Sequence, residues 1–442
     1  MDNLIHISDN SKAKFEPQQL EQLRAIAGVP IRDIQLDGNP HLLVFPHSLS
    51  DCPDKIQDTP IFTIEGDNTL VSGNIMGFVG YKDTRLRIYS RFTKPDEQDY
   101  FLHYMLQRVF SINLFDLQYG ATNEDIFDFL IYLVPAYLKR AYKQGLYKEY
   151  QTHRYNDPNI RGRIDIARHI RHNIPYNGNI AYQTREYAYN NDLTQLIRHT
   201  IEYIRQHPYA GGILLNDTDT KDAIKAIEQA TPTYNRQERA RIINRNLRPI
   251  HHPYYNEYRY LQQLCLQILR HEELKYGTSD SEIYGILFDG AWLWEEYLNT
   301  LLVPIGFAHP RNKENKGAIY LFDPKSAPRY PDFIKPDFIL DAKYKGFANK
   351  RVSEVDRDDL HQLITYMFIE RATCGGLVYP YPYLSGAQDF SSESIVQSSL
   401  RGYGGTISLF GLPIPQGVTS WSEFQREMKN KEQLLIAQIA TH

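Results

Sequence analysis

The stretch that decides the fold is Tyr330–Lys345, which reads YPDFIKPDFILDAKYK. Its second half is an apolar run of strand-forming residues and predicts a β-strand. Side chains alternate along a strand, so Asp341 and Lys343 are expected on the same face. A carboxylate and an ammonium group inside an apolar strand are costly to bury unless they are paired or bind an ion. Metal-dependent phosphodiesterases need this arrangement, because carboxylates hold Mg²⁺ and a lysine positions or activates a water.

A second carboxylate has to come from one of two Pro-Asp pairs. On one unbroken strand Asp337 and Asp341 would lie roughly 13 Å apart, too far to share an ion whose ligands lie at about 2.1 Å. Lys335–Asp337 has turn chemistry, and a hairpin there would bring Asp332 within cross-strand reach of Asp341. We therefore expect Asp332, Asp341 and Lys343 to form the site, with Asp337 as the alternative. A surface hairpin with an Asp341–Lys343 salt bridge is the plain alternative, since short D-x-K matches arise by chance.

Two predicted helices bring further candidates. The first, Phe288–Leu302, carries Glu295 and Glu296 among aromatic residues. Either both glutamates are exposed, or one of them, with Glu295 the first choice, reaches the metal from the edge of the buried face. The second helix, Arg357–Glu370, carries Gln362 and Tyr366 four residues apart and therefore on one face.

Length and pattern predict a multidomain protein of the α/β and α+β classes. At 442 residues, two or three domains are expected. They are a β-rich amino-terminal domain (1–120), a mostly helical middle domain (121–278) and an α/β domain (279–442) whose mixed sheet is flanked by helices. The remaining predicted elements are strands at 42–45, 61–64, 75–79, 86–89, 318–322, 376–379 and 406–410, and helices at 97–110, from 123 through 138, and at 191–206, 219–228 and 255–274.

Composition and charge restrict where the chain works and with what. The longest apolar stretch, Ile126–Leu138, is interrupted by Asp128 and Pro135 and is too short to span a bilayer. The start lacks a secretory signal, and three isolated cysteines favour a reducing compartment. We therefore expect a cytoplasmic protein without a membrane partner.

The formal net charge of −4 is unusual for a protein that grips DNA alone, so either the basic surface is local or a partner does much of the gripping. Two arginine-rich runs, 159–173 and 236–252, could contact phosphate. The alternative for each run is a solvated helix face or an internal ion-pair site.

Several segments together carry a family resemblance. They are DAKYK at 341–345, RGRID at 161–165, AYNNDLTQLI at 188–197 and GNIMGFVGYKDTRLRIYSRF at 73–92. The Asp-Lys hairpin resembles the core motif of the PD-(D/E)xK nuclease superfamily, and the Gln362–Tyr366 pair is similar to the Q-x-x-x-Y element of RecB-type nucleases. As a whole the chain resembles the McrC family, the nuclease subunits of McrBC modification-dependent restriction systems. One departure is the very short connection between the PD and DAK elements.

The resemblance implies a restriction-endonuclease-like carboxy-terminal domain that cuts DNA with Mg²⁺ or Mn²⁺. The expected metal ligands are Asp332, Asp341 and Glu295, with Lys343, Gln362 and Tyr366 also in the catalytic site. It further implies an anti-phage role with a hexameric McrB-like AAA+ GTPase, which the chain would bind through its amino-terminal domain and stimulate. Two other functions stay open: a stand-alone RecB-type DNA repair or processing nuclease, and a non-catalytic activator of an AAA+ partner.

Overall fold

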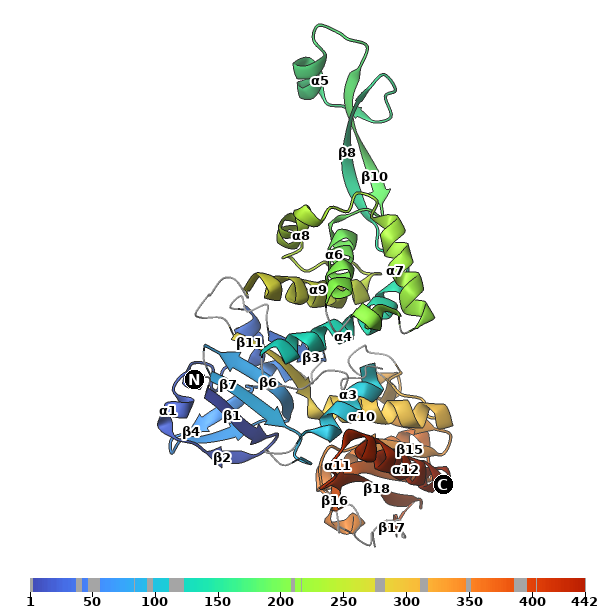
Figure 1. The fold of residues 1–442 in the computed structure, drawn as a ribbon. Coiled ribbons are helices and arrows are strands. Elements are labelled where there is room, and N and C mark those ends of the chain that lie inside the picture. Colours follow the sequence, from blue (N-terminus) through green and yellow to red (C-terminus); the bar gives the residue numbers. More distant parts are fainter. Residues whose placement is uncertain are drawn as a thin grey trace. The chain divides into compact units, whose positions relative to one another are not determined.

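A computed structural model describes residues 3–36, 42–46, 56–82, 84–93, 98–110, 123–207, 211–215, 217–274, 283–310, 317–346, 351–384, 396–402 and 404–441. The chain forms two compact units (Figure 1). One unit combines Met1–Phe115 with Asp280–His442, and the other is Asp116–Ser279. The expected domain limits at 120 and 278 lie outside the described residues, as does the start of the helix expected at 97–110.

The first unit contains a five-stranded sheet to which both ends of the chain contribute. Its order is β1 (Asn3–Ser8), β7 (Thr84–Tyr89), β6 (Ile75–Tyr81), β11 (Ile283–Asp289) and β3 (Leu42–Phe45). β11 pairs antiparallel with β6 and parallel with β3. The helix expected from Phe288 is therefore wrong at its start: Phe288 and Asp289 are strand, and α10 (Gly290–Leu302) begins where the Asp289 side chain caps it.

Smaller elements cover this sheet and close its core. A second sheet has the order β2 (Lys12–Lys14), β5 (Thr69–Ser72) and β4 (Phe62–Glu65). The helices here are α1 (Pro17–Leu20), α2 (Ile31–Leu36) and α3 (Tyr100–Phe110). Side chains of the two sheets and of α1 and α2 share one apolar core, which includes Ile7, Leu20, Ile34, Leu70 and Leu287. The four strands expected between residues 42 and 89 are all present as β3, β4, β6 and β7.

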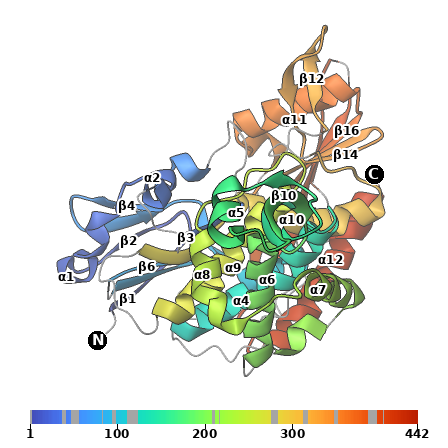
Figure 2. The same ribbon diagram turned by 90° about the horizontal axis from the view of Figure 1, so that it is seen from above.

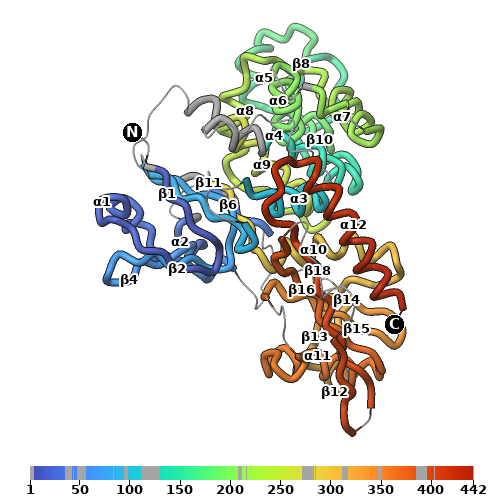
Figure 3. Tube along the Cα trace, turned by 60° about the horizontal axis from the view of Figure 1, so that its bottom comes forward, coloured from blue at the N-terminus to red at the C-terminus, as the bar shows by residue number. Residues whose placement is uncertain are grey.

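The same unit holds a mixed sheet with the order β14 (Phe333–Lys335), β15 (Phe338–Ala342), β16 (Cys374–Leu384), β18 (Thr406–Gln416) and β17 (Val396–Ser399). The three central strands are parallel and both edge strands antiparallel. Between β15 and β16 the chain passes through α11 (Arg357–Glu370), whose Leu363 and Met367 pack on the sheet face that carries Ile339. Figures 2 and 3 show the course of α11 beside the strands of this sheet.

Two further elements complete the carboxy-terminal part. A separate hairpin, β12 (Ile319–Phe322) with β13 (Ser326–Arg329), precedes β14. The final helix α12 (Trp421–Ala440) packs on β18 and was not expected from sequence. The predicted mixed sheet flanked by helices is confirmed as an arrangement of elements.

The second unit is helical with one long β-ribbon. Its helices are α4 (Asn123–Tyr142), α6 (Asp192–Gln206), α7 (Thr218–Ala230), α8 (Arg239–Arg245) and α9 (Asn256–Leu274). The ribbon pairs β8 (Glu149–Asp157) with β10 (Ile180–Ala188), adds the short β9 (Arg163–Ile164), and carries α5 (Ile166–Asn173) at its far end (Figure 1). The expectation of a mostly helical segment missed this ribbon, because β8 (EYQTHRYND) is polar apart from two tyrosines and lacks an apolar alternation.

Among the described residues, none of the helices is both long enough and apolar enough to cross a bilayer.

Candidate functional site

A tight hairpin brings two carboxylates together at one end of the mixed sheet. β14 and β15 pair with Phe333 opposite Leu340, and the same register places Asp332 opposite Asp341. The turn has Asp337 at φ +63°, a left-handed conformation that Asp tolerates better than most residues. The Ala342 N–H donates to Asp332 Oδ2 at 2.6 Å, so the Asp332 carboxylate is anchored against the neighbouring strand.

Asp341 and Lys343 meet on the face of β15 that α11 covers. Lys343 Nζ lies 2.7 Å from Asp341 Oδ2. The Asp341 side chain is 1% exposed, and its Oδ2 has no partner with hydrogen-bond geometry despite this ion-pair distance. Lys343 is held in line with the strand because its N–H donates to the Val378 carbonyl of β16 at 2.9 Å. The buried Asp341 carboxylate is therefore charge-paired with Lys343 at this point.

The pKa values of Asp332 and Asp341 are both raised, as expected for two carboxylates enclosed side by side. Burial, and then the neighbouring Asp341 carboxylate, raise the pKa of Asp332 to about 7. Burial also raises the pKa of Asp341, although the Lys343 ammonium opposes that change. For Lys343, burial alone would lower the pKa, but the Asp341 carboxylate outweighs it and the net pKa is raised. The two aspartates therefore compete for charge, which a cation between them would relieve.

Helix α11 supplies the other contacts of Lys343. Lys343 Nζ donates to Gln362 Oε1 at 3.1 Å, and Gln362 Nε2 donates to the Tyr366 hydroxyl at 2.8 Å. Asp359, which the sequence reasoning missed, lies 3.4 Å from Lys343 Nζ and 2.9 Å from Lys345 Nζ. The available signal was its spacing, since Asp359 precedes Gln362 by three residues and so shares its helix face.

The two glutamates of α10 approach the hairpin through a histidine that the sequence analysis did not single out. His309 Nδ1 lies 2.7 Å from the Asp332 carbonyl oxygen and therefore carries the proton of that hydrogen bond. His309 Nε2 is 3.7 Å from Glu295 Oε1 and 3.9 Å from Glu296 Oε1. The two glutamates lie at similar distances from His309. Burial would lower the pKa of His309, but Glu296 is the one whose hydrogen bond and charge raise it against that effect.

Asp337, the alternative second carboxylate, is placed elsewhere. It is exposed at the turn, where its carboxylate accepts hydrogen bonds of 2.6 Å from both the Thr373 N–H and the Thr373 hydroxyl. These bonds lower the pKa of Asp337. The hairpin thus brings Asp332 rather than Asp337 to Asp341.

The donor set suits a hard divalent cation held by few protein ligands. No group of three His, Cys, Asp or Glu side chains converges as a metal cage within the described part of the chain. Mg²⁺ does not require one, because it commonly keeps several waters and binds through one or two carboxylates together with substrate phosphates. Asp332 and Asp341 fit that requirement, since both are oxygen donors and the strand register sets them opposite each other.

The arginine-rich runs have different surroundings. In the run 236–252, Arg245 Nη1 lies 3.1 Å from Asp192 Oδ1, and Arg241 pairs with Glu238. These two arginines therefore form ion pairs within the protein, which is one of the two alternatives considered for this run. In the run 159–173, Arg161 lies over the Tyr155 ring at 5.7 Å on the ribbon.

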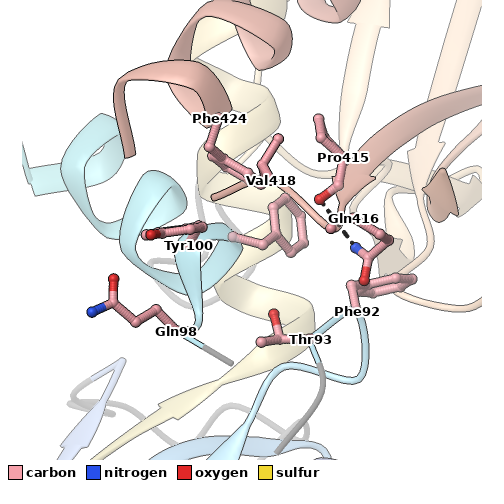
Figure 4. A pocket seen from close by; sticks show the side chains of 10 residues that line it. Phe92, Thr93, Gln98, Tyr100, Pro415, Gln416, Val418 and Phe424 are labelled. Carbon is pink, nitrogen blue, oxygen red and sulfur yellow. Dashed lines mark hydrogen bonds between the residues drawn. The ribbon is translucent and has the colours of Figure 1, made fainter. Parts of the chain in front are cut away.

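A small pocket of about 130 Å³ lies apart from the carboxylates, between the start of α3 and the chain that follows β18 (Figure 4). Its lining is aromatic and amide-bearing, including Phe92, Tyr100, Gln416 and Phe424, and contains no charged side chain. It therefore offers no acid–base or metal chemistry.

Fold and site together define a multidomain α/β protein with a carboxylate pair and a lysine where β14 begins and β15 ends in its mixed sheet. The chain matches the family model described as McrBC 5-methylcytosine restriction system component over residues 70–380, well over half of its length. It belongs to that family. No protein among the curated sequences compared matches the chain.

Two solved structures are similar to the chain. One is a refined half-complex from a tetradecameric assembly of Thermococcus gammatolerans McrB AAA+ hexamers with bound McrC. The match has 17% identity, a TM-score of 0.47, and covers 97% of this chain and 99% of that one. The other is the cryo-EM structure of the Thermococcus gammatolerans McrBC complex, with 18% identity, a TM-score of 0.32, and coverage of 68% and 87%.

Proposed function

We propose that this chain is the metal-dependent DNA endonuclease subunit of an McrBC-type restriction system, with a PD-(D/E)xK nuclease domain at its carboxy-terminal end. The observation that carries the proposal is the pairing register that sets Asp332 opposite the buried Asp341, with the Lys343 ammonium 2.7 Å from Asp341 Oδ2. A surface salt bridge would not explain this arrangement, because Asp341 is buried and Asp332 faces it with like charge.

Each residue of the site has its own role. Asp332 and Asp341 hold Mg²⁺ or Mn²⁺, and the bound ion supplies charge stabilisation of the phosphate and a more acidic water. Lys343 orients the attacking water and is itself oriented by Gln362, which Tyr366 holds in place. Asp359 keeps Lys343 and Lys345 on the α11 side of the sheet.

We do not assign Glu295 as a direct ligand of the metal ion. Its approach runs through His309, so we assign the Glu295–Glu296 pair to the support of the Asp332 backbone and, at most, to water-mediated contact with the ion.

The proposal includes an AAA+ GTPase partner that switches cleavage on and whose nucleotide hydrolysis the chain stimulates. Family membership supports it. The sequence expectation assigns docking to residues 1–120, but exposed apolar side chains favour the ribbon. Of the 20 exposed large hydrophobic side chains in the described residues, only Leu4 lies before residue 111. Nine lie on or beside the ribbon: Tyr150, Ile160, Ile164, Ile166, Ile170, Ile174, Tyr176, Tyr187 and Tyr189. Such a gathering is typical of a protein-binding surface.

The decisive experiment is cleavage of methylated and unmethylated plasmid DNA by the full chain, with and without the cognate AAA+ protein and its nucleotide. We expect cutting only with partner, nucleotide and Mg²⁺ together, and loss of cutting in Asp341→Ala and Lys343→Ala. Asp358→Ala is the matched control, because Asp358 is a 91% exposed carboxylate on α11. Calorimetric titration with Mg²⁺ or Mn²⁺ provides a second readout, in which Asp341→Ala should lose binding and the control should keep it.

The outcomes separate the three functions. Efficient partner-independent cutting would favour a stand-alone nuclease. Stimulation of the partner's hydrolysis with neither cleavage nor metal binding would favour a non-catalytic activator. Cutting by a folded Asp341→Ala variant would contradict the assigned site.

A further inference from the structure

The residue after Lys343 is inserted into the amino-terminal part of the first unit. Tyr344 is buried, and its ring meets the Phe92 ring edge-on with centroids 5.5 Å apart. Its hydroxyl lies 3.2 Å from Ser90 Oγ and donates to Met76 Sδ at 3.3 Å. The end of β15 is thus enclosed by residues that follow β7 or belong to β6.

Arg91, which follows β7, connects the backbone of Tyr344 to the residue directly after β1. Its Nη1 donates to the Tyr344 carbonyl oxygen at 3.1 Å, and its guanidinium carbon lies 4.6 Å from the Tyr344 ring centroid. Its Nε donates to Asp9 Oδ2 at 2.9 Å, and its backbone N–H donates to Asp9 Oδ1 at 2.5 Å. Asp9, directly after β1, is fully buried, and its carboxylate is the counter-ion of the Arg91 guanidinium. A planar guanidinium with fixed donor directions holds such acceptors in one geometry.

The same cluster reaches the start of α10. Arg91 Nη2 donates to Asn74 Oδ1 at 2.5 Å, and the Asn74 carbonyl accepts from the Gly290 N–H at 2.9 Å. A Cβ at Gly290 would lie 2.9 Å from Tyr344 Cε1, so any larger residue here would displace the Tyr344 ring. One guanidinium therefore connects the end of β15, with Asp341 in the strand and Lys343 directly after it, with the helix that carries Glu295.

We propose that Arg91 is a positioning residue for the candidate site. It holds the Tyr344 carbonyl and so sets the orientation of Lys343 relative to Asp341, and it makes that orientation depend on β1 and β7. The inference rests on the nuclease function proposed above. No contact of Arg91 with substrate or metal is involved, so its effect is on the geometry of the strand end and not on DNA binding.

The test uses Arg91→Lys in the full chain with its partner. Lysine keeps the positive charge but cannot bind the Tyr344 carbonyl, Asp9 and Asn74 together. We expect kcat for DNA cleavage to fall about ten-fold or more (a loss of positioning) with KM for DNA unchanged. Hydrogen exchange of amides in 338–346 should quicken, while exchange in α6 stays the same. Arg32→Lys is the matched control, because Arg32 is half-exposed and its ion pairs are with the surface carboxylates Asp33 and Asp58.

Each result bears on the inference. Unchanged kcat in Arg91→Lys, a rise in KM alone, or unchanged exchange in 338–346 would overturn it. If the wild-type chain does not cut DNA, the proposed function fails, and the exchange measurement still decides whether Arg91 orders the end of β15. If Arg91→Lys does not fold, Asn74→Ala, which removes one guanidinium acceptor and leaves the Asp9 pair, takes its place with the same two readouts.

Discussion

Replacement of Asp332 by asparagine should stabilise the metal-free protein at neutral to alkaline pH. In the folded chain the pKa of Asp332 is raised to about 7, first by burial and then by Asp341. The folded state therefore binds this proton more tightly than the unfolded chain does. The resulting stability is fully present below the ordinary aspartate pKa of 3.8 and is lost as the pH rises through about 7. At pH 8 the wild type carries the whole cost of the ionised pair.

The size of the effect follows from this shift. One pKa unit corresponds to about 1.4 kcal/mol, so the whole shift sets an upper bound of about 4 kcal/mol. We expect a gain of about 2 kcal/mol in Asp332→Asn at pH 8, because Asp332 is only half-buried and shares its charge interaction with Asp341. The new amide keeps an oxygen for the Ala342 N–H and adds an N–H donor where the ionised carboxylate repelled Asp341.

The assay is urea unfolding in EDTA at pH 4.5 and pH 8, followed by tryptophan fluorescence. All three tryptophans, Trp292, Trp294 and Trp421, lie in the first unit, so the signal reports the unit that holds the site. Asp358→Asn, at an exposed position of α11, is the control and should change nothing. A loss of stability in Asp332→Asn at pH 8, or an equal change at both pH values, would refute the reasoning.

Three further outcomes are expected. Asp337→Asn should leave DNA cleavage intact and lower the urea midpoint at pH 7, because Thr373 holds the pKa of Asp337 low; this stability is present above the ordinary aspartate pKa of 3.8 and is lost as the pH falls through the lowered folded value, so titrated unfolding checks it. Tyr297→Phe should cost about 1–3 kcal/mol in urea unfolding, because the hydroxyl donates at 2.6 Å to the buried Glu432; a cost near zero would contradict a buried, partnered carboxylate. Asp359→Asn should reduce kcat for cleavage several-fold in steady-state assays while circular dichroism stays unchanged; unaltered kcat would remove it from the site.

Local sequence was sufficient where chemistry and structure are adjacent in the chain. Turn residues between two apolar runs predicted the hairpin of β14 and β15, and period-two alternation predicted that Asp341 and Lys343 share a face. Helix α11 was predicted with its observed limits, and the Gln362–Tyr366 contact follows from helical spacing. These features depend on neighbours within a few residues, so they can be inferred without knowing the rest of the fold.

Other features could not be inferred because their partners lie far along the chain. Residues 283–289 form strand β11 because they pair with β3 and β6, which come much earlier in the sequence. Helix α10 therefore begins at Gly290 rather than at the predicted Phe288. The β8–β10 ribbon lacks the apolar alternation from which a strand is predicted. Its nine-residue register is seen only in the pairing of the two strands. His309 entered the site only through a bridge from Ala308 to Ile334 that brings it to Asp332.

The sequence by itself determined the mixed sheet with its helices and the choice of Asp332 over Asp337 as the neighbour of Asp341, because both depend on local spacing and turn geometry. The family was indicated by the resemblance of several sequence segments to its members. Tertiary structure alone decided that Asp341 is buried, that Asp359 and His309 join the group, and that Arg91 holds the end of β15. Burial and contacts between distant residues set these properties, and they exist only once the whole chain has packed.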